Sequence, residues 1–134
     1  MERNVKRATR VLRQLESRKP DLVEIRFDRM KSTSGLSEIR DVTDRPLIAT
    51  NRRVDEGGYY SGAESKRLGI LVQAARSSFD YVDLELRTRD INQLAGQLKQ
   101  EGAKVIVSHH DQKLPPSQFA LESILAREKR TGPD

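Results

Sequence analysis

The sequence predicts an α/β fold of the (β/α)8 TIM-barrel type, present as a partial barrel that forms a single domain over residues 1–134. Helical and extended patterns alternate along the whole chain, and the links between them are short. Repeated strand–helix units of this kind imply a parallel sheet with right-handed crossovers. Each extended segment is polar on one face toward its C-terminal end. An open sheet covered on both sides would need two apolar faces, so the polar face favours a barrel interior.

The chain opens with a predicted amphipathic helix that ends at Lys19–Pro20, since proline disfavours helical backbone in the residue before it. Residues 1–19 hold seven basic and two acidic side chains, which account for the formal net charge of +5. This excess is typical of a solvated helix face. A nucleic-acid partner is not expected, because three Phe, three Tyr and no Trp leave little to stack on bases. The apolar residues at helical spacing are Val5, Ala8, Leu12 and Leu15.

Four strands are predicted, at residues 21–28, 46–52, 80–86 and 104–108, because apolar and polar side chains alternate along them. The apolar faces would meet the helices, and the polar faces would line the barrel. The apolar faces hold Val23, Ile25 and Phe27, then Leu47 and Ala49, then Val82, Leu84 and Leu86, and last Val105 and Val107. The opposite faces hold Glu24, Arg26 and Asp28, then Ile48, Thr50 and Arg52, then Asp83 and Glu85, and last Ile106, Ser108 and His110.

Helices are predicted in the intervals, each with a local signal at one end or an apolar face. Gly102 closes one of them and Ser117 caps the last, which ends near Arg130. The expected ranges are 37–42, 63–77, 91–100 and 117–130, with a loop at 55–58. The apolar face of the second of these helices holds Leu68, Leu71, Val72 and Ala75.

Composition narrows the setting of the protein. No cysteine is present, which excludes disulfides and thiolate metal sites and fits a reducing compartment. The two histidines are adjacent, which makes a structural zinc site improbable. No apolar run approaches the roughly 20 residues needed to cross a bilayer, and no secretory signal is evident at the N-terminus. We therefore expect a cytoplasmic protein with no membrane partner.

A barrel of this kind places its chemistry at the mouth formed by the C-terminal ends of its strands. Arginines there suit a substrate with a carboxylate or phosphate, and a histidine beside carboxylates suits proton transfer near neutral pH. The inward strand ends gather Glu24, Arg26, Arg52, Glu85 and His110.

Each of these residues also has a structural explanation. Glu24 and Arg26 could form an ion pair, Arg52 could be solvated, and a histidine at a strand end is most often a loop residue. Carboxylates such as Asp83 are most simply ligands for interior polar groups. Gly57–Gly58 is a weak phosphate-loop signal and is more typical of a flexible turn. The agreement of four strand ends outweighs any one residue.

Four stretches in this order resemble type I 3-dehydroquinate dehydratase, a hydro-lyase of the shikimate pathway that leads to chorismate and the aromatic amino acids. They are Asp21–Asp28, Pro46–Arg52 followed by Asp55–Gly58, Asp80–Leu86, and Val105–Asp111. Their spacing is similar to that of the family, and they span nearly the whole chain. The resemblance implies strands two to five of a (β/α)8 barrel, with no cofactor and no metal.

The resemblance also implies a reaction and a set of roles. In the family, a lysine forms a Schiff base with the ketone of 3-dehydroquinate, a histidine removes the neighbouring proton, and water leaves to give 3-dehydroshikimate. By motif, His110 would be the general acid/base and Glu56 would assist it. Glu24 and Arg26 would contact substrate hydroxyls, and Arg52 would bind substrate. The complete enzyme is expected to be a homo-oligomer, a dimer.

Two features of the family pattern are not matched within the 134 residues. The first strand would precede the first helix, and the Schiff-base lysine would follow Asp134, which looks like the opening of another strand, as Asp21 and Asp80 are. None of the eight lysines lies at an inward strand end. We therefore expect that residues 1–134 alone neither turn over substrate nor persist as a monodisperse monomer. The alternative is a non-catalytic, basic α/β binding or assembly module.

Overall fold

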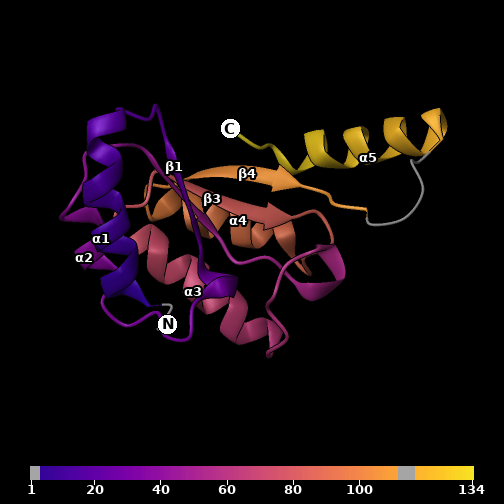
Figure 1. The fold of residues 1–134 in the computed structure, drawn as a ribbon. Helices are drawn as coiled ribbons and strands as arrows, with labels where there is room; N and C mark the ends of the chain where they lie inside the picture. Colours follow the sequence, from indigo (N-terminus) through magenta and orange to yellow (C-terminus); the bar gives the residue numbers. More distant parts are fainter. Residues whose placement is uncertain (1–3, 112–116) are drawn as a thin grey trace.

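A computed structural model describes residues 4–111 and 117–134. Its centre is a parallel four-stranded sheet in the order β1-β2-β3-β4 (Figure 1). The strands are β1 Val23–Arg26, β2 Leu47–Thr50, β3 Tyr81–Glu85 and β4 Lys104–Ser108. Sequential strands are therefore neighbours and alternate with helices, which confirms the α/β partial barrel expected from the sequence.

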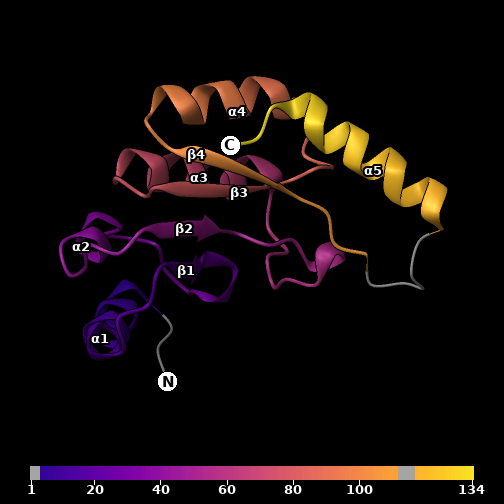
Figure 2. The ribbon, with the colours of Figure 1, turned by 90° about the horizontal axis from the view of Figure 1, so that it is seen from above.

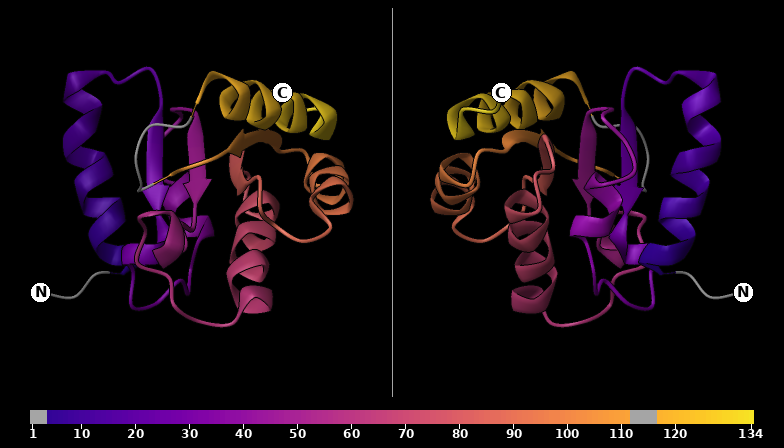
Figure 3. Two further views of the ribbon diagram at one scale, coloured as in Figure 1. Left: turned by 90° about the vertical axis from the view of Figure 1, so that its right-hand side faces the viewer. Right: turned by 90° about the vertical axis from the view of Figure 1, so that its left-hand side faces the viewer.

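In the described part of the chain, five α-helices accompany the sheet: α1 Val5–Leu15, α2 Ser37–Arg40, α3 Glu64–Arg76, α4 Ile91–Gln100 and α5 Gln118–Thr131. Seen from above, α1 and α5 lie toward the two edge strands, and α3 and α4 lie beside the central and last strands (Figure 2). The two side views show α1, α3 and α4 around the outside of the strands (Figure 3). Within the described residues, no helix is both long and apolar enough to cross a membrane.

The predicted apolar faces of the strands form the core. Leu47, Ala49, Val82, Leu84 and Val105 are all fully buried, and they join one cluster with the apolar residues of the helices. The buried face of α3 differs from the expected one: Leu71 and Ala75 are buried, but Leu68 and Val72 are only partly buried. The remaining buried residues of α3 are Arg67 and Ala74.

The first strand ends earlier than the alternation of side chains predicted. Phe27–Arg29 forms a 3-10 turn, in which the Met30 N–H donates to the Phe27 carbonyl. The carboxylate of Asp28 explains this early end of the strand. It accepts hydrogen bonds from the N–H of Tyr59 and from Nε and Nη2 of Arg26. These local hydrogen bonds compete with strand pairing and turn the chain away from the sheet.

Two other aspartates bind the backbone of a neighbouring strand through their carboxylates. The Asp80 carboxylate accepts the N–H of Leu47, 2.8 Å away, at the beginning of β2. The Asp134 carboxylate accepts the N–H of Val105 at 3.0 Å, and the Asp134 N–H donates to the Val105 carbonyl. Asp134 thus lies against the edge of β4 that does not pair with β3.

Candidate active site at the C-terminal ends of the strands

A buried polar network joins the C-terminal ends of β2, β3 and β4. Arg52 Nη1 donates to Ser108 Oγ at 2.7 Å, and Arg52 Nη2 donates to Asp83 Oδ2 at 3.0 Å. Ser108 Oγ donates to Asp83 Oδ1 at 2.6 Å, which closes the network. The Arg52 side chain is 7% exposed, so the solvated explanation of this residue was wrong. Asp83 serves an interior polar group, as expected.

Glu56 and His110 meet beside this network. The loop after β2 folds back through a 3-10 turn over Val54–Glu56 and a Gly57 with a φ of 80°, a conformation that favours glycine. Glu56 Oε2 lies 3.5 Å from His110 Nδ1 and accepts the His110 N–H at 3.2 Å. Glu56 is buried, whereas the His110 side chain is 43% exposed. A carboxylate thus orients an imidazole that ligands can still reach.

The two adjacent histidines face different surroundings, as strand alternation predicted. His110 reaches Glu56 in the loop after β2. His109 instead lines a groove beside α5, together with Leu121, Ile124 and Leu125. Of the two adjacent histidines, His110 is therefore the one that pairs with Glu56.

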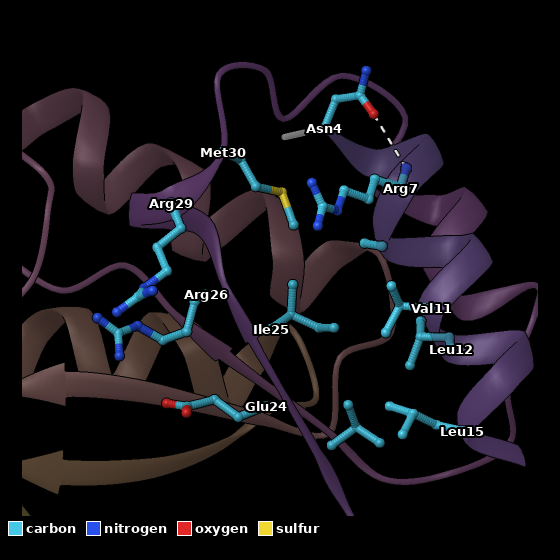
Figure 4. Close-up of a pocket in the computed structure, with 12 residues that line it drawn as sticks. Asn4, Arg7, Val11, Leu12, Leu15, Glu24, Ile25, Arg26, Arg29 and Met30 are labelled. Atoms are coloured by element: carbon cyan, nitrogen blue, oxygen red, sulfur yellow. Dashed lines mark hydrogen bonds between the residues drawn. The ribbon is translucent and has the colours of Figure 1, made fainter. Parts of the chain in front are cut away.

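Glu24 and Arg26 lie on the face of β1 opposite Ile25 and α1 (Figure 4). The Glu24 carboxylate accepts the hydroxyl of Thr50 at 2.7 Å. The ion pair of Arg26 is with Asp28 and not with Glu24, through two hydrogen bonds of 2.8 Å each. Burial works to raise the pKa of Asp28, but the hydrogen bonds and charge of Arg26 outweigh it and hold the pKa below its usual value. A groove of about 460 Å³ lies along β1 and α1, and all four residues of β1, from both of its faces, contribute to its lining.

Glu85 differs most from its predicted place. It is 1% exposed and lies under the junction of β2 with its loop, not open to the mouth. Its Oε1 accepts the N–H of Arg53 at 3.1 Å, and its Oε2 lies 2.5 Å from Nη1 of Arg67. Burial raises the pKa of Glu85 against the opposing charges of Arg67 and Arg52.

Sequence reasoning did not single out Arg67, the fully buried arginine of α3. A signal was present, because Arg67 precedes Leu71 by four residues and Ala74 by seven, and so shares their helix face. An arginine at such spacing is usually taken as solvated, and of its two carboxylate partners only Glu64 is on the same helix, whereas Glu85 is on β3.

Comparison with known proteins shows which family this chain is similar to. The profile of the family described as Type I 3-dehydroquinase matches residues 1–134. The 3-dehydroquinate dehydratase of Methanothrix thermoacetophila is 36% identical over 127 residues, which are 95% of this chain and 54% of that protein. The bifunctional 3-dehydroquinate dehydratase/shikimate dehydrogenase of Arabidopsis thaliana is 36% identical over 119 residues, 85% of this chain and 20% of that protein.

Solved structures of 3-dehydroquinate dehydratases have a similar fold. The 3-dehydroquinate dehydratase of Geobacillus kaustophilus superposes with a TM-score of 0.85 at 23% identity, over 94% of this chain and 53% of that one. The type I enzyme of Clostridium difficile gives a TM-score of 0.83 at 25% identity, over 98% of this chain and 56% of that one. The chain thus spans about half the length of the single-function relatives and structures that it matches.

Proposed function

The chain belongs to the type I 3-dehydroquinase family, and from that premise we propose that it forms part of the active site of a 3-dehydroquinate dehydratase. The reaction would convert 3-dehydroquinate to 3-dehydroshikimate and water. The observation that carries this proposal is the pairing of buried Glu56 with accessible His110, beside the guanidinium of Arg52.

His110 would act as the general acid/base. Because Glu56 approaches Nδ1, Nε2 is the nitrogen left to exchange a proton with substrate. The second oxygen of Glu56, Oε1, is buried and accepts no hydrogen bond from any described residue. A buried acceptor without a donor is costly, so a donor from substrate or water would satisfy it. A module held together only by ion pairs would have no need of this arrangement.

Three further residues would bind substrate. Arg52 uses one N–H of each terminal nitrogen on Ser108 and Asp83, which leaves donors for a polar group of the substrate. Glu24 and Arg26, on the inward face of β1, would contact substrate hydroxyls. The substrate would thus lie across the ends of β1, β2 and β4.

The imine-forming lysine would be contributed from outside residues 1–134. Among the described lysines, Lys104 lies at the N-terminal beginning of β4, away from the mouth, and Lys99 contacts Asp134. Lys113, which follows β4 in the sequence, is outside the described residues. Borohydride reduction of residues 1–134 with 3-dehydroquinate, followed by mass spectrometry, is expected to yield no adduct. A reduced adduct on any of the eight lysines would overturn this assignment.

Calorimetric titration with 3-dehydroquinate tests the substrate. We expect binding by the unaltered chain and roughly tenfold or greater weakening in Arg52→Met, since hydrogen bonds to charged groups contribute about 1.5–3 kcal/mol. Arg53→Met is the matched control, because Arg53 is adjacent but pairs with Asp55 at the surface. Absence of binding by the unaltered chain contradicts the proposal.

The complete enzyme is expected to be a cytoplasmic homodimer, as the family resemblance implies. Sedimentation equilibrium of the complete protein measures its oligomeric state, and a monomer at all concentrations would contradict this expectation.

A further inference from the structure

The parallel sheet opens between β2 and β3, beside the candidate active site. The other two ladders continue to the strand ends: Arg26 is in register with Thr50, and Glu85 is in register with Ser108. The registered pairs between β2 and β3 are Ile48 with Tyr81 and Ala49 with Val82. Beyond Ala49, the backbone of β2 therefore needs other hydrogen-bond partners.

The guanidinium of Arg67, on α3, supplies one of these partners and also contacts three side chains. Arg67 Nη1 donates to the carbonyl of Asn51 at 3.0 Å and lies 2.5 Å from Glu85 Oε2. Nη2 donates to the Thr88 hydroxyl at 3.2 Å, and Nε and Nη2 each donate to the Glu64 carboxylate at 2.8 Å. The side chain is 0% exposed. Burial works to lower the pKa of Arg67, but Glu64 and Glu85 outweigh it and raise the pKa.

These contacts hold the backbone on both sides of Arg52. On one side, Arg67 binds the carbonyl of Asn51 directly. On the other side, Glu85 accepts the N–H of Arg53, and Arg67 holds Glu85 in place. One guanidinium thus anchors residues 51 and 53, and the side chain between them enters the network with Ser108 and Asp83.

The same anchor supports the loop that carries Glu56. Gly58 N–H donates to the Arg53 carbonyl at 2.7 Å, and Tyr60 N–H donates to the Arg52 carbonyl at 3.1 Å. A Cβ at Gly58 would come within 2.1 Å of the Arg52 carbonyl oxygen, so the loop packs directly on this backbone. A shift at residues 52 and 53 would therefore move Glu56 away from His110.

We propose that Arg67 is a positioning residue of the active site, which fixes the junction of β2 with its loop and thereby aims Arg52 and Glu56. The relevance to catalysis rests on the proposed function; the anchoring of the junction does not. Lysine cannot replace it, because a single ammonium lacks the planar fork that reaches Glu64, Asn51 and Thr88 together. A purely structural role would require only that the Glu85 charge be neutralised.

Four variants separate positioning from charge neutralisation. Arg67→Met removes both the charge and the fork, and Arg67→Lys keeps the charge alone. Arg67→Met combined with Glu85→Gln removes both buried charges, which guards against failure to fold. Arg76→Met is the matched control on the same helix, because Arg76 is 60% exposed and pairs with Glu101 at the surface.

Amide hydrogen exchange of the 134-residue chain is the first readout. In Arg67→Lys, protection of Tyr60 N–H is expected to fall roughly tenfold or more relative to Leu47 N–H, which Asp80 holds at the far end of β2. In Arg76→Met the ratio of the two should not change. Parallel loss at Tyr60 and Leu47 in the Arg67 variants would mean general destabilisation and would overturn the proposal.

Affinity for 3-dehydroquinate is the second readout, set against the melting temperature. Arg67→Lys and the double variant are expected to recover most of the melting temperature that Arg67→Met loses. Both are nevertheless expected to bind 3-dehydroquinate roughly tenfold more weakly than the unaltered chain. Affinity that recovers together with stability would leave Arg67 a structural role only and would overturn the proposal. If the unaltered chain does not bind 3-dehydroquinate, the proposed function fails, and amide exchange alone then decides whether Arg67 fixes the junction.

Discussion

Two of the arginine–aspartate pairs, Arg52 with Asp83 and Arg53 with Asp55, have very different surroundings. Between β2, β3 and β4, Arg52 and Asp83 are 7% and 12% exposed, and Ser108 satisfies both of them. In the loop after β2, Arg53 and Asp55 are 37% and 50% exposed. The adjacent residues Arg52 and Arg53 therefore contribute differently to stability. Water screens the outer pair, whereas removal of one partner of the inner pair leaves a buried charge uncompensated.

The largest expected effect concerns the acid–base pair beside the inner network. In the complete enzyme, His110→Ala is expected to lower the dehydration rate by about 10²–10⁴-fold, the range of a general acid/base. His109→Ala is the matched control, because His109 faces α5. Steady-state kinetics on the two variants measures the difference. Equal losses would show that the assignment of the two histidines to opposite faces is wrong.

The inner pair itself should be important for stability. Asp83→Ala leaves the Arg52 guanidinium without its closest carboxylate, and breaking a buried pair in this way typically costs about 3–5 kcal/mol. Denaturant unfolding monitored by circular dichroism gives the free energy of unfolding. A loss of less than about 1 kcal/mol, as for a surface pair, would remove the distinction between the two regions.

A pH dependence is expected from Arg26 and Asp28, whose side chains are 29% and 0% exposed. Because the pKa of Asp28 is lower in the folded protein than in the unfolded chain, its stabilising contribution is complete above the unfolded value. The contribution is lost as the pH falls through the folded value. Unfolding free energies between about pH 5 and pH 2 should fall less steeply in Asp28→Asn than in the unaltered chain. Identical slopes would mean that Asp28 does not ionise as the geometry implies.

The smallest effect is expected at the outer pair. Arg53→Met should change the free energy of unfolding by less than about 1 kcal/mol, because exposed pairs gain little and lose side-chain entropy. Added salt should have little effect on the variant. A loss as large as that of Asp83→Ala would show that the Arg53 side chain, and not only its N–H, supports the site.

The fold and the separation of the two histidines could be predicted from the sequence, because both depend on the alternation of side chains along the strands. The strand at 104–108 and the helix at 91–100 have the expected bounds, and alternation correctly separated His110 from His109. What it could not predict came from contacts between distant elements. Asp28 ended β1 through the N–H of Tyr59, and Glu85 was buried by Arg67 from α3. Neither partner is adjacent in sequence.

The most direct test of the central claim is an NMR titration of the ¹⁵N-labelled chain with 3-dehydroquinate. If this chain supplies the acid–base pair and the arginine that binds substrate, the largest shifts will be at the amides of residues 52–58 and 108–110. Amides that line only the groove between α1 and β1, such as those of Val11 and Leu15, will change little. Shifts confined to the amides of α1, or none at saturating ligand, would contradict the account.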